Sequence, residues 1–307
     1  MKLLAKGGFA DVGWRLKGAN ESDMIWRMIM ATALAATAGG CGLEGAFVYF
    51  PTKVIDRTPA DEKVPYESVT ITTSDGLKLE AWYMPPTRAD GAVILHCHGN
   101  SGDLSNRVGL FELFHPLGLG LLVLDYRGFG RSEGSPSEAG TGLDAEAAWR
   151  HLTQTRGIAA SRIFLHGQSL GGGVAAELAT RVKPAGLILE ATFTSLTDAA
   201  ADMFWFLPVR WVMRTWYPTK DRLAKIDCPV LVLHSRQDQI IPFHHGQALF
   251  QAAGEPKRFV EITGDHNTGI YYCQKVYLGA IQQFTDDGLR AHWPASAPAS
   301  QPGTPAK

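Results

Sequence analysis

Apolar and polar residues follow two different patterns along the middle of the chain. In the segments 68–73 and 77–83 they alternate, on either side of the residues SDG at 74–76. Alternation of this kind predicts two antiparallel strands joined by a tight turn, because successive side chains of a strand point to opposite faces of the sheet. This hairpin should open the sheet.

Six short, continuous apolar runs follow the hairpin, with segments of helical length between them. They are AVILHC from Ala92, GLLVLDY from Gly120, RIFLHG from Arg162, GLILEA from Gly186, PVLVLHS from Pro229 and RFVEIT from Arg258. Such runs are typical of strands that are buried on both faces of a parallel sheet. Together with the hairpin they predict an α/β fold with a mostly parallel eight-stranded sheet and helices on both faces.

One of the intervening helices carries a start signal. The residues TGLD at 141–144 match a capping box, which predicts that the helix between the fourth and fifth strands begins there. Its apolar face should consist of Leu143, Ala147 and residues 149–152.

The composition divides the chain into three parts. Residues 46–290 carry all the predicted strands, and a chain of 307 residues with 45% apolar residues can bury one large core, so we expect one α/β domain. Between its sixth and seventh strands, residues at about 196–224 form a predicted cap. Residues 291–307 are rich in Pro, Ala and Ser and should be a disordered tail. Residues 1–45 form the third part.

This amino-terminal part contains an apolar stretch, MIWRMIMATALAATAGGC at 24–41. It is short for a membrane span of about 20 residues and resembles the apolar region of a secretory signal. Cys41 follows small residues, as the acylated cysteine of a bacterial lipoprotein does, although Ala38 stands where that signal prefers Leu. We expect membrane attachment through Cys41 or a periplasmic location, with residues 42–66 as a tether. The alternative is a helix packed on the domain of a cytoplasmic protein.

Charge and cysteine content exclude some classes of function. The chain has 29 basic and 30 acidic residues, a net charge of −1, so no overall field attracts it to nucleic acid. Its four cysteines are scattered without a C-x-x-C spacing, which indicates neither a zinc knuckle nor a disulfide framework. We expect them to be buried thiols.

The most informative motif is GQSLG at 167–171, between a predicted strand and a predicted helix. A serine in so sharp a turn takes a strained backbone conformation, and its neighbours must be small because the strand and the helix come close together. The turn would raise the Ser169 hydroxyl above the sheet and place the N–H of Leu170 at the start of a helix, where it can stabilise an anion. Ser169 is therefore the candidate nucleophile, and a purely structural turn is the alternative.

A serine hydroxyl needs a base, and the base needs an acid that orients it. Asp238 follows the seventh predicted strand and His266 follows the eighth, so both should lie at the carboxyl edge of the sheet with Ser169. Chain order Ser, Asp, His fits a nucleophile elbow of this kind. The alternatives are a turn carboxylate for Asp238 and a surface histidine for His266.

A second turn, HGNSG at 98–102, follows the third predicted strand. It could aim the N–H of Asn100 at the same point as that of Leu170, although His-Gly could equally serve only to shape the turn. His96 and His98 could share a strand face and bind a metal, but no third ligand follows at a suitable spacing. We therefore expect no metal and no cofactor. At the end of the fourth strand, Arg127 is expected to form a structural ion pair.

With these motifs, residues from about 64 to 289 resemble the α/β-hydrolase superfamily. The segments HCHGNSGD, DYRGFGRSEG, GQSLGG, SRQDQIIP and GDHNTG are similar to its branch of α/β-hydrolase-domain serine hydrolases, which includes depalmitoylase-like proteins. This resemblance implies Ser169 as nucleophile, Asp238 as acid, His266 as base, and Asn100 with Leu170 as the oxyanion hole. One departure is Asp265, where the branch usually has Gly before the histidine.

The motifs and the resemblance favour a serine hydrolase that cleaves carboxylic esters or thioesters through an acyl-enzyme. Its partner would be a small-molecule substrate, and the aromatic segment 200–218 of the predicted cap suits an acyl or lipid-like group. That segment could equally be a helix that only packs on the sheet. Two other functions stay open: a non-catalytic binding protein of the same fold, and an amidase or peptidase that uses the same three residues.

Overall fold

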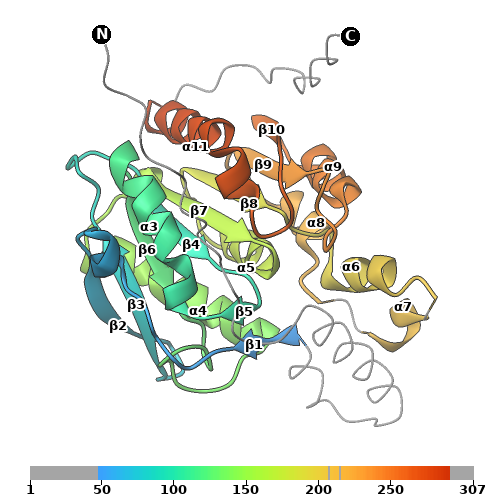
Figure 1. Cartoon of the computed structure of the whole chain (residues 1–307), viewed down its shortest axis with the longest axis horizontal. Coiled ribbons are helices and arrows are strands. Elements are labelled where there is room, and N and C mark those ends of the chain that lie inside the picture. Colours follow the sequence, from blue (N-terminus) through green and yellow to red (C-terminus); the bar gives the residue numbers. More distant parts are fainter. Residues whose placement is uncertain (1–47, 207, 214–215, 291–307) are drawn as a thin grey trace, which may run out of the picture. The chain divides into compact units, whose positions relative to one another are not determined.

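The computed structural model of the chain describes residues 48–206, 208–213 and 216–290 (Figure 1). The predictions for residues 1–45, for Cys41 and for the tail at 291–307 lie outside these residues. In the part of the chain that is described, no helix is both long and apolar enough to cross a membrane.

An eight-stranded sheet forms the centre of the described part (Figure 1). Its strands are β2 (Glu67–Thr72), β3 (Lys78–Met84), β4 (Val93–Cys97), β6 (Gly120–Leu124), β7 (Ile163–Gln168), β8 (Gly186–Glu190), β9 (Val230–Ser235) and β10 (Lys257–Ile262). Their order is β10-β9-β8-β7-β4-β6-β3-β2. β3 is antiparallel to both β2 and β6, and the other neighbours are parallel. The predicted hairpin, the six apolar strands and the mostly parallel α/β fold are confirmed.

Helices cover both faces of this sheet. They are α3 (Val108–Phe114), α4 (Glu138–Arg150), α5 (Leu170–Ala179), α6 (Leu196–Met203), α7 (Val209–Val212), α8 (Thr219–Leu223), α9 (Phe243–Ala252), α10 (Gly269–Tyr272) and α11 (Gln274–Leu289). Shorter turns of helix are Pro59–Glu62, Leu104–Arg107, His115–Leu117, His151–Thr155 and Ala160–Arg162. Helices α6, α7 and α8 occupy the stretch between β8 and β9 where the sequence predicts a cap.

Two separate apolar cores explain the continuous apolar runs. Leu95 of β4 packs in one core with α4, α5 and α9, whereas its neighbour Ile94 packs in the other with α3 and α11. Val232 and Leu231 of β9 divide in the same way. Because successive side chains face opposite sides, a strand covered on both faces must be apolar at every position.

The predicted start of α4 is wrong. The helix begins at Glu138, and the side chain of Ser137 accepts the N–H of Gly140 as its cap. Thr141 lies inside the first turns, where its hydroxyl donates to the carbonyl of Glu138. Asp144, which completes the capping pattern in the sequence, instead accepts the backbone N–H of Arg127. The acidic residue of the predicted capping box, Asp144, is therefore bonded to Arg127 from another loop and does not cap the helix.

Arg127 forms the structural ion pair that the sequence predicts. Its guanidinium donates to Asp144 of α4 at 2.9 Å and to Asp75 in the β2–β3 turn at 2.8 Å. The guanidinium holds the pKa of Asp75 down at about 2. Arg127 thus joins the hairpin to the layer of helices.

Two very short strands have no counterpart in the prediction. β1 (Phe50–Pro51) pairs in parallel with β5 (Ser101–Gly102), outside the main sheet. Two-residue strands carry no readable periodicity, so only the structure reveals them. They matter because β5 directly follows Asn100.

Candidate active site

β7 passes into α5 through a sharp turn at Ser169. The backbone of Ser169 has φ 53° and ψ −122°, a region that residues other than glycine seldom adopt. A Cβ at Gly167 would collide with the carbonyl oxygen of Gly171, and a Cβ at Gly171 would collide with that of Cys97. Both glycines are therefore required by the close approach of strand and helix, as the motif predicts.

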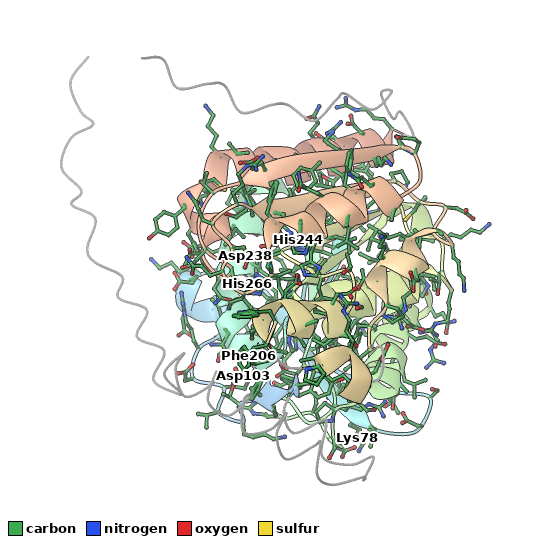
Figure 2. All side chains as sticks on the ribbon, turned by 90° about the vertical axis from the view of Figure 1, so that its right-hand side faces the viewer. Lys78, Asp103, Phe206, Asp238, His244 and His266 are labelled. Carbon is green, nitrogen blue, oxygen red and sulfur yellow. The ribbon has the colours of Figure 1, made fainter. Side chains whose placement is uncertain are left out.

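Ser169, His266 and Asp238 form one hydrogen-bonded line. The Nε2 atom of His266 lies 2.9 Å from Ser169 Oγ, and its Nδ1 atom lies 2.8 Å from Asp238 Oδ2. Figure 2 labels Asp238 and His266, which come from the loops after β9 and β10. The structure thus brings together three side chains from three separate strand ends. Both Asp238 and His266 are buried.

Hydrogen bonds around Asp238 fix the direction of this line. Its Oδ1 atom accepts the backbone N–H groups of Ile240 and Ile241, at 2.9 and 2.8 Å. An ionised carboxylate can only accept, so His266 donates from Nδ1 and a neutral ring keeps Nε2 free to accept the Ser169 hydroxyl. Such an arrangement can remove the proton from a serine as it attacks.

The carboxylate of Asp265, the departure from the family pattern, accepts hydrogen bonds from residues of its own loop. Its Oδ1 atom accepts the N–H of Asn267 at 3.0 Å and that of Thr268 at 2.9 Å, and also the hydroxyl of Thr268. The carboxylate therefore shapes the turn that presents His266.

Known sequences resemble this chain over most of the described part. A model of the serine aminopeptidase S33 family matches residues 88–221. The alpha/beta hydrolase domain-containing protein WAV2 of Arabidopsis thaliana is 36% identical over an alignment of 268 positions that covers 78% of this chain and 86% of WAV2. The chain belongs to the α/β-hydrolase family.

Other comparisons agree with this assignment. YfhR of Escherichia coli K12 is 32% identical to this α/β hydrolase over 230 residues, which cover 72% of the chain and 79% of YfhR. Among solved structures, the esterase Pf2001 of Pyrococcus furiosus has a TM-score of 0.66 at 19% identity and covers 79% of this chain and 98% of its own. At that identity the likeness shows the fold, and it confirms the α/β-hydrolase fold predicted from the sequence.

Of the two residues predicted for an oxyanion hole, one directly follows Ser169 and the other directly follows a glycine that lies close to Ser169. Leu170 is the first residue of α5, so its N–H belongs to the first turn, which has no intrahelical acceptor. Asn100 follows Gly99, where an added Cβ would lie 3.5 Å from the Cβ of Ser169. The carbonyl of Gly99 accepts the Nδ1–H of His98 at 2.7 Å. Because C=O and N–H point opposite ways across a trans peptide, this bond turns the N–H of Asn100 away from His98.

Residues 48–52, here called the strap, hold this second turn. The N–H of Phe50 donates to the carbonyl of Asn100 at 2.8 Å, and the Asn100 side chain donates to the carbonyl of Val48 at 2.8 Å. Thr52 donates its N–H to Gly102 at 3.0 Å. The turn is therefore fixed by residues about 50 positions earlier in the chain, a contact that no local motif signals.

Below Ser169, buried polar side chains cross the sheet from β4 to α11. His96 Nδ1 lies 3.1 Å from His166 Nδ1, and His166 Nε2 lies 2.8 Å from Glu190 Oε2. The hydroxyl of Tyr277 donates to the same carboxylate oxygen at 2.6 Å. Burial holds the pKa of His96 well below its usual range, so its ring is neutral. His96 thus pairs with His166 and not with His98, and the two do not form a pair of metal ligands.

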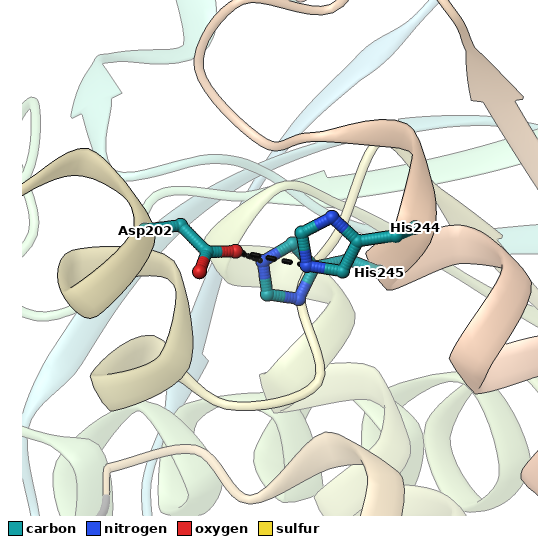
Figure 3. A group of neighbouring side chains, drawn as sticks. All are labelled: Asp202, His244 and His245. Atoms are coloured by element: carbon teal, nitrogen blue, oxygen red, sulfur yellow. Dashed lines mark hydrogen bonds and ion pairs between the residues drawn. The ribbon is translucent and has the colours of Figure 1, made fainter. Parts of the chain in front are cut away.

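One group among the described residues has the spacing of a metal site, and it lies outside the triad (Figure 3). The Asp202 Oδ2 atom of α6 lies 2.9 Å from His244 Nε2 and 3.0 Å from His245 Nε2, both on α9. His245 Nδ1 accepts the backbone N–H of Thr194 at 3.1 Å, and burial lowers the pKa of this histidine. The neutral ring therefore carries its proton on Nε2, where a metal would need a bare nitrogen. The group acts as a hydrogen-bonded link between α6 and α9.

Sequence reasoning missed the strap, Glu190 and Tyr277. Glu190 ends an apolar run that predicts only a strand, and Tyr277 lies within a helix 87 positions later. The one available signal was an acidic residue at the end of a strand buried on both faces, since buried carboxylates seldom occur without specific donors.

Proposed function

We propose that this α/β hydrolase is a serine hydrolase that cleaves carboxylic ester or thioester bonds through an acyl-enzyme. The observation that carries the proposal is the unbroken line from Asp238 through His266 to Ser169, which ends at a serine in a strained turn. Strained residues of this kind are found chiefly at functional sites, because a structural turn would use glycine there.

In the proposed reaction, Ser169 Oγ attacks the carbonyl carbon while His266 Nε2 takes its proton. The carbonyl oxygen becomes negative, and the N–H groups of Leu170 and Asn100 would stabilise it. His266 then gives the proton to the departing alcohol or thiol, which leaves the acyl group on Ser169. Water, activated by the same histidine, attacks the acyl-enzyme and restores the hydroxyl. Asp238 orients the ring and stabilises its charged form.

Two alternatives make different predictions from the same residues. A binding protein of this fold would need neither the strained Ser169 nor the aligned His266, so the geometry favours an enzyme. An amidase or peptidase would use the same line of residues, and the matching family model is named for a serine aminopeptidase. Only a comparison of ester and amide substrates distinguishes an esterase or thioesterase from an amidase or peptidase.

The stretch after α6 suggests an apolar substrate. Trp205 is 82% exposed and Phe206 is 58% exposed, whereas Phe204 beside them is buried. Large aromatic side chains exposed together mark a surface that meets other apolar groups. We therefore propose an acyl or lipid-like group as the part of the substrate that this cap contacts.

Attachment to a membrane through Cys41 remains part of the proposal, with one correction. The predicted tether at 42–66 is too long, because Phe50 and Pro51 already belong to β1. Residues 42–49 reach about 28 Å when fully extended, at about 3.5 Å per residue. An acylated Cys41 would therefore keep the strap, and with it the turn at Asn100, within that distance of the lipid.

A serine-directed probe tests the enzymatic proposal directly. We expect a fluorophosphonate to label the wild-type chain and not Ser169→Ala, and p-nitrophenyl esters from acetate to palmitate to be hydrolysed faster than the matching p-nitroanilides. Labelling of the Ala variant, or no labelling of the wild type, would overturn the assignment. Faster anilide cleavage would favour the amidase.

Fractionation tests the attachment separately. Full-length protein made in a bacterial host should enter the detergent phase and take up labelled palmitate, and Cys41→Ser should release it or leave it unprocessed. A wild-type chain that stays in the aqueous phase, unlabelled and with its first 40 residues intact, would contradict the proposal.

A further inference from the structure

Residues 190–192, here called the clamp, form hydrogen bonds with both the N–H and the carbonyl of Ser169. Its N–H donates to the carbonyl of Glu190 at 2.9 Å. Its carbonyl accepts the hydroxyl of Thr192 at 2.6 Å. Between these two contacts Ala191 has a φ of 46°, a second unfavourable conformation for a residue other than glycine. Two strained residues on adjacent strand ends thus hold each other through hydrogen bonds.

Strain of this kind persists only where the surroundings fix the backbone. A residue in a rarely populated conformation is energetically unfavourable, so it relaxes when its contacts are weakened. For Ser169, relaxation would move Oγ relative to His266 Nε2. The orientation of the nucleophile therefore depends on how firmly the clamp itself is held.

The side chain of Glu190 anchors the clamp from below. Glu190 is 4% exposed. Its carboxylate accepts hydrogen bonds from Tyr277 Oη at 2.6 Å and His166 Nε2 at 2.8 Å, while Gln168 Nε2 lies 3.4 Å from its second oxygen. These donors come from α11 and from β7, the strand that ends directly before Ser169. A buried carboxylate is tolerated because such donors replace its water, so each donor also fixes its position.

We propose that Glu190 is a positioning residue for the nucleophile: its buried carboxylate, held by Tyr277 and His166, fixes the clamp and so aims Ser169 Oγ at His266. Glu190 does not touch the substrate and moves no proton in the reaction. The proposal rests on the serine-hydrolase function proposed above. In addition, α11 would control the reactivity of Ser169 through Tyr277, and not only the stability of the fold.

Tyr277→Phe is the sharpest test, because it keeps the ring and removes one hydroxyl far from the reacting atoms. Thr285→Val is the matched control: Thr285 lies on the same helix, is fully buried, and donates only to carbonyls of its own helix. We expect Tyr277→Phe to lower kcat about tenfold with KM within about twofold, the pattern of an interaction lost in the transition state. Thr285→Val should lower Tm and leave kcat unchanged.

Glu190→Gln provides the conservative comparison. Glutamine keeps one oxygen that Tyr277 and His166 can donate to, so it should lose less activity than Glu190→Ala, measured per folded molecule. If Tyr277→Phe and Glu190→Gln both keep the wild-type kcat, or if Thr285→Val lowers kcat as much as they do, the proposal is wrong and the network is only part of the core.

A structural readout separates this proposal from the proposed function. Crystal structures of Tyr277→Phe and of the wild type should differ in the distance from Ser169 Oγ to His266 Nε2, which should lengthen by about 0.5 Å or more, the tolerance of a positioned site. An unchanged distance overturns the positioning role, whether or not esters are hydrolysed. A wild type inert to esters with a lengthened distance in the variant would instead contradict the hydrolase and support the clamp.

Discussion

The two turns that meet beside Ser169 are held by different means. The turn at 167–171 is enclosed by a strand, a helix and the clamp, and glycines that have no room for a Cβ fix its path. The turn at 98–102 is held by the strap, which contains the two-residue strand β1 and makes a few hydrogen bonds. Close packing and the clamp together thus fix the proposed nucleophile, whereas a few hydrogen bonds alone fix the proposed oxyanion donor. Variants of the first turn should therefore fail outright, and variants of the second should lose activity by degrees.

The largest effect on activity is expected from Ser169 in the first turn and from His266, which is hydrogen-bonded to it. Ser169→Ala and His266→Ala should each lower kcat/KM by about 10³-fold to 10⁶-fold, because members of one catalytic unit fail together. Their Tm should stay within a few degrees of the wild type. His115→Ala is a suitable control, since His115 precedes the amino end of β6, at the opposite edge of the sheet. Ester hydrolysis and melting curves of the three variants decide the matter.

The next largest effect concerns the steric basis of that turn. Gly171→Ala should lower the free energy of unfolding by about 3 kcal/mol, because its methyl group would meet the carbonyl of Cys97. Gly279→Ala is the matched change in α11, where nothing lies near the added carbon. It should instead stabilise the helix by about 0.5–1 kcal/mol. Urea unfolding of both variants measures the contrast, and equal effects would refute it.

A smaller effect is expected from the strap. Phe50→Pro removes the N–H that donates to Asn100 and should lower kcat about tenfold, less than the 10²-fold to 10³-fold typical of losing an oxyanion donor itself. Phe50→Ala keeps that N–H and controls for the lost ring. Should the two variants have the same kcat, the strap would have no part in holding the turn.

The smallest effect is expected from Asp125, and it concerns stability rather than activity. The Oδ1 atom of Asp125 lies 3.7 Å from Nε2 of His98, the first residue of the second turn. Burial raises the pKa of Asp125 from the usual value of about 4 to about 8. Between these values the unfolded chain has lost a proton that the folded chain keeps, so stability falls as the pH rises from 4 to 8. Asp125→Asn cannot ionise and should gain on the wild type over this range, as urea unfolding at pH 4, 6 and 8 would show. A difference that does not vary with pH would contradict the raised pKa.

The contrast between the turns also explains what the sequence could reveal. Strands buried on both faces appear as apolar runs, and the motif around Ser169 can be interpreted because steric limits dictate its glycines. Asp238 and His266 could be placed because each directly follows such a run. The geometry brings these three together, while their roles, like those of Asn100 and Leu170, await the experiments above.

What the sequence did not reveal depends on contacts between distant segments. The strap contacts Asn100 from 52 residues earlier in the chain, and Glu190 contacts Tyr277 across 87 residues. Neither contact leaves a local pattern. Thr141 shows the opposite failure: the sequence carries a capping pattern there, but the helix begins at Glu138 and Asp144 accepts the N–H of Arg127. Local signals decide where elements lie, but only the packed chain decides which polar groups find each other.

Cys97, whose carbonyl lies against Gly171 in the turn at 167–171, has a consequence for redox chemistry. Burial raises the pKa of its thiol to about 12, and burial likewise raises that of Cys228 to about 12. Thiolates are the forms that react with alkylating agents and peroxides, and these two are absent at neutral pH. Iodoacetamide and hydrogen peroxide should therefore leave the site beside Cys97 intact. We therefore expect the proposed active site to be insensitive to whether its surroundings are reducing or oxidising.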